Sequence, residues 1–204
     1  MIYDLAPAMT QTLILASASA SRKSLLTNAG VRFTALPSGV DEATLKSGFS
    51  GPPEALALML ATAKAVSLSR LYPQALVIGG DQLLVCNGQI YDKPQDRTAA
   101  AAQLRALAGQ THALVTAVCL VENGQTLWSH TESAHLTMRP LSEVFLAEYL
   151  AAEGDALLQC VGAYRLEALG AQLFERIEGD YFTVLGLPLL ALLGALRARH
   201  VLAA

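Results

Sequence analysis

Apolar and polar positions divide the chain into short strands and amphipathic helices that alternate. Residues 13–16 and 75–80 are continuous apolar or glycine-containing runs, which are typical of buried strands. The second run stops at Asp81, so we expect this carboxylate at a strand end. Residues 111–138 alternate between apolar and polar on both sides of an Asn-Gly pair, which predicts two antiparallel strands joined by a tight turn.

Helices are predicted where segments of helical spacing lie between start and stop signals. Such signals are glycine after the last helical residue, serine before the first, and proline in the first turn. The expected helices are residues 21–28 before Gly30, a long alanine-rich helix from Pro53 to before Tyr72, residues 96–108 before Gly109, one opened by Ser142 and Glu143, and residues 187–199.

Further strands and turns complete the pattern. We expect a strand at residues 31–36, a loop at residues 37–53, a hairpin at Asn87-Gly88 and a strand pair that turns near Gly179-Asp180. Because helices and strands interleave and hairpins are added, the pattern favours an α/β fold with a mixed sheet over a purely parallel one.

Composition narrows the class of protein. The chain has 204 residues, of which 53% are hydrophobic and 15% charged, as expected for one compact domain or two closely joined lobes. A net charge of −3 argues against a broad basic surface for a nucleic-acid polymer. The longest apolar stretch, TVLGLPLLALLGAL, is too short to span a bilayer, and the first dozen residues lack a basic leader region. We therefore expect no membrane partner and a cytoplasmic location.

The stretch LILASASASRKSLL, residues 13–26, is the first candidate for chemistry. A strand that ends in small residues and leads into a helix places free backbone amides, short hydroxyls and the positive helix end around an anion-sized space, and Arg22 and Lys23 add full charges. The stretch is not a P-loop. A helix N-cap followed by a solvated cationic turn explains the same residues, so other groups must converge on it.

Acids and lysines elsewhere could meet that stretch. Asp81 closes an apolar strand, and Asp41 and Glu42 lie in a loop after a strand; the alternative is that the loop acids are only solvated. Carboxylate oxygens suit Mg²⁺ or Mn²⁺. Lys64 lies on a helix of small residues, where it either extends into solvent or reaches a phosphate, and Lys93 follows the predicted hairpin.

Five ordered segments resemble the Maf family of nucleotide pyrophosphatases. They are LILASASASRKSLLTNAG, SGVDE, ATAKA, GGDQLLVCNGQIYDKP and VGAYRLEALGAQLFERIEGDYFTVLGLPL. The family is related to the inosine triphosphate pyrophosphatase group. The resemblance implies a single Maf-like domain over residues 1–204, with a short extension at residues 1–12, and a two-lobed α/β fold with a long mixed sheet, flanking helices and a central cleft.

The resemblance also implies an activity, a cofactor and an assembly. The activity is hydrolysis of a nucleoside triphosphate to the monophosphate and pyrophosphate, with a divalent metal such as Mg²⁺ or Mn²⁺, commonly in a homodimer. By their match to the family's motifs, the site residues are expected to be Asp81, Glu42 and Lys93 for catalysis, Glu42 and Asp81 for the metal, and Ser17, Ser19, Arg22, Lys23 and Lys64 for the phosphates.

Three further positions are taken to govern the choice of base. Gln82 and Glu167 resemble the branch of the family that acts on 7-methyl-GTP, whereas the branch acting on dTTP and UTP would show Thr and Gln. Ser21 departs from both branches, which have Trp and Arg there. These three residues therefore leave two alternatives for the base of the substrate, 7-methylguanine and a pyrimidine.

Two other functions compete with a pyrophosphatase that removes unwanted nucleotides. One is a nucleotide-binding regulator of cell division with little turnover, since the family was first associated with inhibition of septum formation. The other is a phosphohydrolase or phosphotransferase that releases orthophosphate. Asp81, Glu42 and Lys93 favour the pyrophosphatase, because a binding module needs the cations but not these acids.

Overall fold

The computed structural model describes residues 11–203. Most of the predicted extension at residues 1–12 therefore lies outside the described residues. The strands, in chain order, are β1 Leu13–Leu15, β2 Thr34–Ala35, β3 Leu76–Cys86, β4 Gln89–Tyr91, β5 Thr111–Glu122, β6 Gln125–Met138 and β7 Phe174–Glu178. The α-helices are α1 Ala20–Asn28, α2 Glu42–Ser47, α3 Pro53–Leu71, α4 Arg97–Leu107, α5 Glu143–Glu153, α6 Tyr181–Val184 and α7 Leu189–Ala198.

All of these strands belong to one mixed sheet. Its order is β2-β1-β3-β5-β6-β7, and β4 pairs with β3 off this path. Strand β1 pairs in parallel with β2 and β3, whereas β3–β4 and β6–β7 are antiparallel. The expectation of an α/β fold with a mixed sheet flanked by helices is confirmed.

The chain forms two compact units. Unit 1 contains the described residues up to Asp81, Thr116–Glu132 and those from Gly186 onward, and unit 2 contains Gln82–Val115 and Ser133–Leu185. Strands β3, β5 and β6 each contribute residues to both units.

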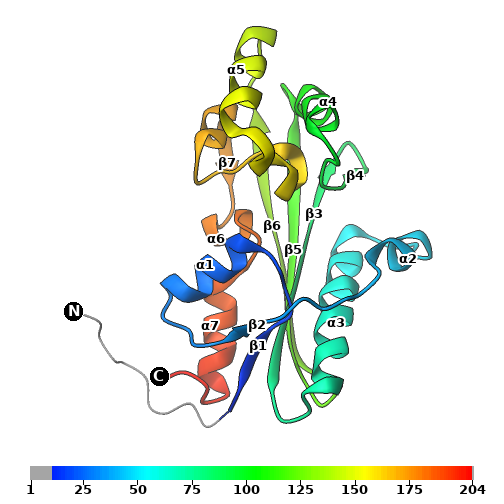
Figure 1. The fold of residues 1–204 in the computed structure, drawn as a ribbon, viewed down its shortest axis with the longest axis vertical. Helices are drawn as coiled ribbons and strands as arrows, with labels where there is room; N and C mark the ends of the chain where they lie inside the picture. The colour runs from blue at the N-terminus through cyan, green and yellow to red at the C-terminus, as the bar shows by residue number, and fades with distance from the viewer. Residues whose placement is uncertain (1–10, 204) are drawn as a thin grey trace. The chain divides into compact units, whose positions relative to one another are not determined.

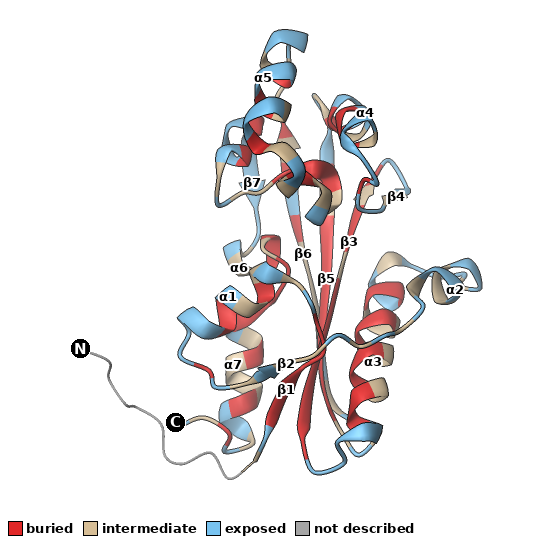
Figure 2. Cartoon of the chain, in the orientation of Figure 1, coloured by how far each residue is buried: buried red, intermediate tan, exposed pale blue. Residues whose placement is uncertain are grey.

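In unit 1, helices cover both faces of the strands. Helix α3 lies on one face, and α1 and α7 lie on the other (Figure 1). Helix α3 begins at Pro53, where the missing amide hydrogen costs no helical bond, and buries a stripe that includes Leu56, Leu60 and Leu68. Figure 2 shows the buried residues of α3 and α7 against the strands, whereas α2 has no buried residue.

Unit 2 has its own apolar core. Helix α4 contacts α5 and the two short 3₁₀ helices at Gly154–Gln159 and Val161–Ala163. Leucines of the strands, of α4 and of the segment after α5 fill the space, among them Leu84, Leu104, Leu136 and Leu173.

Both predicted Asn-Gly turns are confirmed. Asn87 and Gly88 have φ of 50° and 78°, and Asn123 and Gly124 have φ of 46° and 76°. Positive φ at both central residues matches the twist of an antiparallel pair, and Asn-Gly adopts it at low cost. These turns connect β3 to β4 and β5 to β6.

Three sequence-based expectations about secondary structure are wrong. Strand β3 does not stop at Asp81 but continues to Cys86, so Asp81 lies inside the strand. The predicted loop at residues 37–53 contains α2, whose N-cap is Asp41. The chain after β7 does not return as a second strand, because Asp180 accepts a hydrogen bond from the Thr183 amide and begins α6.

No helix among residues 11–203 is long and apolar enough to cross a membrane.

His112 is a buried titratable group in the core of unit 2. The residue is 1% exposed, its Nε2 lies 2.8 Å from the hydroxyl of Tyr164, and the rings of Tyr164 and Phe174 pack around it. Nδ1 has no hydrogen-bond partner among the described residues. Burial lowers the pKa of His112 to about 4, because the charged ring would lose its hydration.

We expect this histidine to make stability depend on pH. The folded chain binds the proton only near pH 4, whereas the unfolded chain binds it below about 6.5, so unfolding gains protons between these values. The His112 contribution is complete above pH 6.5 and is lost as the pH falls to 4, by up to about 3 kcal/mol. Urea unfolding at pH 7, 5.5 and 4 should show a steeper loss for the wild type than for His112→Gln; parallel losses contradict the expectation.

Candidate active site

The loop between β1 and α1 is held by one hydrogen bond to β3 and by local hydrogen bonds of its serines. The Ala16 amide donates to the carbonyl of Ile78 at 2.8 Å, which fixes the end of β1 beside β3. The Ser17 hydroxyl accepts from the Ser19 amide at 3.2 Å, and the Ser19 hydroxyl caps α1 by accepting from the Arg22 amide at 3.4 Å. Ser19 therefore has the capping role that was the alternative explanation for this stretch. Ser17 is not the cap; it is buried and accepts a hydrogen bond from Arg22, so capping by Ser19 does not exclude an anion site here.

Arg22 is the buried cation of this loop. Its Nε donates to the carbonyl of Gly186 at 2.7 Å and its Nη1 to the Ser17 hydroxyl at 3.3 Å. A Cβ on Gly80 would lie 3.3 Å from Nε, so the guanidinium packs against the bare backbone of β3. Burial lowers the pKa of Arg22, and the charges of Asp81 and Glu42 oppose this effect. An arginine nevertheless stays charged, because its pKa begins so high.

A lysine and two acids from three different elements form the centre of the candidate site. The Lys64 ammonium, on α3, lies 2.6 Å from Oδ1 of Asp81 on β3 and 2.8 Å from Oε1 of Glu42 on α2. Side chains of Lys64 and Asp81 are 10% and 8% exposed, whereas that of Glu42 is 41% exposed. Lys64 therefore points into unit 1 and not into solvent.

Close packing of α3 on β3 makes this contact possible. A Cβ on Gly79 would lie 2.1 Å from the carbonyl oxygen of Ala61 and 2.8 Å from Cβ of Ala65, both on α3. Since alternate residues of a strand face the same side, Asp81 faces α3 as Gly79 does. Lys64 lies between the two alanines along the helix and so meets Asp81.

The Asp81 carboxyl is a stronger base than an ordinary aspartate. Burial raises its pKa, the charges of Lys64 and Arg22 lower it, and nearby Glu42 adds to the increase. The net direction is upward, because removal of water from the carboxylate outweighs the two cations. A buried carboxylate with a raised pKa suits proton transfer.

The donor set near Lys64 fits a divalent cation of the Mg²⁺ type. Both acids provide hard oxygen ligands, and both already converge on one cationic nitrogen. Within residues 11–203 there is no group of three or more His, Cys, Asp or Glu side chains placed to hold a metal ion. Two carboxylates alone are a common protein contribution to Mg²⁺, with water and phosphate oxygens completing the shell.

The other predicted site residues lie in unit 2, apart from Lys23 and Ser21, which are half-buried on α1. The Gln82 amide donates to the carbonyls of Thr183 and Val184 at 2.9 and 3.2 Å and thereby caps the end of α6. Lys93 and Glu167 are exposed. Both influence the thiol of Cys160: burial is the main cause of its raised pKa, Glu167 adds to it, and Lys93 opposes it.

Sequence reasoning missed the glycines that arrange these groups. Gly79 and Gly80 contact α3 and Arg22 from opposite sides of β3, and Gly186 supplies a carbonyl to Arg22. A glycine inside an apolar strand indicates that another segment approaches the strand closely. The Gly79-Gly80 pair could therefore have been used to predict close contacts on β3 next to Asp81. Gly186 had no such signal, because its partner is 164 positions away.

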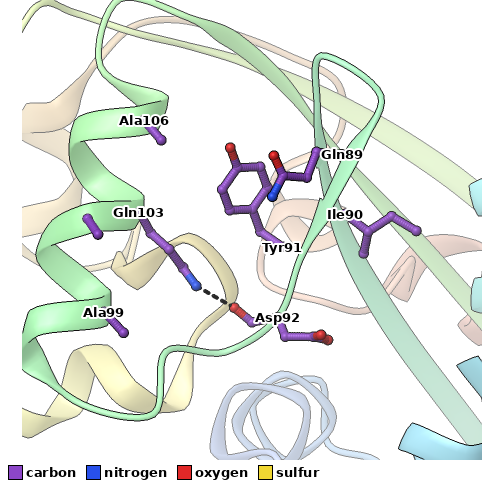
Figure 3. A pocket seen from close by; sticks show the side chains of 8 residues that line it. Gln89, Ile90, Tyr91, Asp92, Ala99, Gln103 and Ala106 are labelled. Carbon is purple, nitrogen blue, oxygen red and sulfur yellow. Dashed lines mark hydrogen bonds between the residues drawn. The ribbon is translucent and has the colours of Figure 1, made fainter. Parts of the chain in front are cut away.

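A surface pocket of about 480 Å³ lies elsewhere in unit 2, between β4 and α4. Figure 3 shows Tyr91 and Gln103 facing each other across it, with the Gln103 amide donating to the carbonyl of Asp92 at 2.7 Å. None of the predicted site residues lines this pocket, and small alanines form its helical wall. We do not assign it to the site.

Comparison with known families identifies the chain. The family described as Maf-like protein matches residues 12–199, so this protein belongs to the Maf family. That confirms the resemblance found in the five sequence segments.

Relatives match over nearly their whole length. A protein of Rhizobium etli named 7-methyl-GTP pyrophosphatase is 49% identical over 192 residues, which are 93% of this chain and 96% of the relative. One of Rhizobium meliloti with the same name is 50% identical over 194 residues, with the same coverage. A nucleoside triphosphate pyrophosphatase of Granulibacter bethesdensis is 51% identical over 195 residues, 93% of this chain and 98% of the relative.

The close packing at Gly79 leads to a stability prediction. Gly79→Ala should lower the free energy of unfolding by at least about 2 kcal/mol, because the new methyl group overlaps a backbone carbonyl of α3 that cannot rotate away. Gly194→Ala is the matched control: its Cβ meets nothing closer than 4.0 Å, and it should stabilise α7 by up to about 1 kcal/mol. Urea unfolding of both variants tests this, and equal effects of the two would contradict it.

Proposed function

We propose that this protein is a nucleoside triphosphate pyrophosphatase, which releases pyrophosphate and a nucleoside monophosphate. One observation carries the proposal: two acids share the Lys64 ammonium, and buried Arg22 lies close enough to affect the pKa of Asp81. Membership of the Maf family and the names of the relatives agree with this chemistry.

In the proposed reaction, water attacks the α-phosphorus. The water oxygen forms a bond to phosphorus, the bond from that phosphorus to the bridging oxygen breaks, and the electron pair leaves on pyrophosphate. Asp81 orients the water and accepts its proton, a role that its raised pKa favours. Arg22, Lys64 and the amides of the β1–α1 loop stabilise the charge that develops on the leaving group.

We propose that serine hydroxyls and basic side chains together bind the phosphates of the substrate. Ser17, Ser19 and Lys23 join Arg22 and Lys64 in this role by their place on the β1–α1 connection. Lys93 keeps the catalytic role that the family resemblance implies, as a cation for the phosphate chain.

A divalent cation, Mg²⁺ or Mn²⁺, is proposed as cofactor. Glu42 and Asp81 would hold it, and when bound it would neutralise charge on the phosphate oxygens. These acids also hold the Lys64 ammonium, so we expect Lys64 to move onto a phosphate when substrate and cation bind.

The choice of base is proposed to lie with Ser21, Gln82 and Glu167. The Glu167 carboxylate can accept hydrogen bonds from guanine N1–H and the exocyclic amine, and its negative charge favours a cationic methylated ring. We therefore propose 7-methyl-GTP as substrate, with a pyrimidine triphosphate as the alternative that Ser21 leaves open. A homodimer, a cytoplasmic location and removal of unwanted nucleotides complete the proposal.

The activity test centres on Asp81. Asp81→Asn should keep the fold and lower kcat by about 100-fold or more, because the amide cannot accept the proton. Asp155→Asn is the control: Asp155 forms an exposed ion pair with Arg97 and should retain full activity. Purified protein with Mg²⁺ or Mn²⁺ and a nucleotide panel is assayed separately for pyrophosphate and orthophosphate.

Other outcomes would replace the proposal. Release of orthophosphate by the wild type indicates a phosphohydrolase. Nucleotide binding without turnover indicates the regulator of cell division. Near-normal pyrophosphate release by Asp81→Asn contradicts the role of Asp81.

Base selection is tested separately. Glu167→Gln should lower the ratio of kcat/KM for 7-methyl-GTP to that for UTP, because the amide has no charge and replaces one of the two acceptor oxygens that face the guanine N1–H and amine with a donor. Glu178→Gln, which removes an exposed partner of Arg176 on β7, is the control. An unchanged ratio in Glu167→Gln would show that base selection lies elsewhere.

A further inference from the structure

Glu153 is a buried carboxylate in an unfavourable place. It is the last residue of α5, where the negative end of the helix dipole opposes an acid, and its side chain is 1% exposed. Burial of a carboxylate is costly unless it is paired and hydrogen-bonded. Its position therefore requires strong partners.

Those partners are the two ends of one short turn. Nε and Nη2 of Arg165 both reach Oε2 of Glu153, at 2.8 and 2.7 Å. The amide of Leu169 donates to Oε1 at 3.2 Å. One buried carboxylate thus holds residues 165 and 169, and Glu167 lies midway between them.

The turn has little freedom to adopt another shape. The Ala168 amide donates to the carbonyl of Arg165 at 3.1 Å, and a Cβ on Gly170 would lie only 2.3 Å from that carbonyl oxygen. On the other side, Tyr164 is buried and its hydroxyl meets Nε2 of His112 at 2.8 Å. The backbone that carries Glu167 is fixed from both directions.

We propose that Glu153 is a positioning residue for base selection, which acts by holding the turn that presents Glu167. The proposal rests on the function proposed above, in which Glu167 contacts the base. Glu153 does not itself touch the substrate. The clamp keeps the exposed Glu167 carboxylate in one place, so that a hydrogen-bonding edge of the base meets a preorganised partner.

The test is the substrate ratio of Glu153→Gln. This variant keeps the shape of the side chain and an oxygen for the Leu169 amide, but it loses the ionic bond to Arg165. The ratio of kcat/KM for 7-methyl-GTP to that for UTP should fall by about tenfold towards the ratio of Glu167→Gln, because small displacements of a positioned group cost large factors in rate. A purely structural role would lower kcat/KM for both nucleotides equally.

A double variant isolates the mechanism. In the Glu167→Gln background, Glu153→Gln should change the ratio no further, since the group that it positions has gone. Glu143→Gln is the matched control: it is an acid on the same helix, with an exposed pairing to Arg105 at 2.7 Å, and it should leave the ratio unchanged. If Glu153→Gln does not fold, Arg165→Lys keeps the charge but loses the two-nitrogen contact and should lower the ratio in the same direction.

Different results separate this proposal from the function on which it rests. No pyrophosphate release by the wild type overturns both. An active wild type with an unchanged ratio in Glu153→Gln, an equal loss for both nucleotides, or a further change in the double variant overturns the positioning role alone.

Discussion

Helix α3 can lie against strand β3 only because Gly79 has no side chain. The approach of the Ala61 carbonyl to that position brings the next turn of the helix, with Lys64, over the face of β3 that carries Asp81. Glu42 then reaches the same ammonium from α2. The charged cluster of unit 1 depends on this backbone contact, since a wider separation would leave the Asp81 carboxylate buried without its cation.

The charges of this cluster are balanced among themselves. Buried Arg22, Lys64 and Asp81 and half-exposed Glu42 are two cations and two acids, so the cost of burying the first three is offset by opposite charges. A triphosphate would add negative charge to an arrangement that is already neutral. This imbalance is a physical reason, apart from family membership, to expect a divalent cation with the substrate.

Unit 2 uses a buried carboxylate in a different way. Around Asp81, the acid is the one proposed to accept the proton of the attacking water, and its cation is a neighbouring lysine. At Glu153, the ion pair and the Leu169 amide fasten a turn, and the exposed residue in the middle of the turn is the one proposed to meet the base. In both places a charged group that is costly to bury constrains the backbone or side chains around it.

Local patterns were enough to predict the helices α1, α3, α4, α5 and α7 and the Asn-Gly hairpins, because capping, turn geometry and periodicity depend on neighbouring residues, and the mixed sheet followed from the way these elements interleave. Ser19 as N-cap and the turn at Asn123-Gly124 are examples. The family was identified from the resemblance of five sequence segments and not from these patterns. The continuation of β3 through Asp81, the helix after Asp180 and the bond from Arg22 to Gly186 were not predictable in this way. We expected the strand to end at Asp81 because a carboxylate is normally hydrated and therefore exposed. In the structure, Lys64 of α3 pairs with the buried Asp81 in place of water. Such a partner exists only once distant segments of the chain have come together.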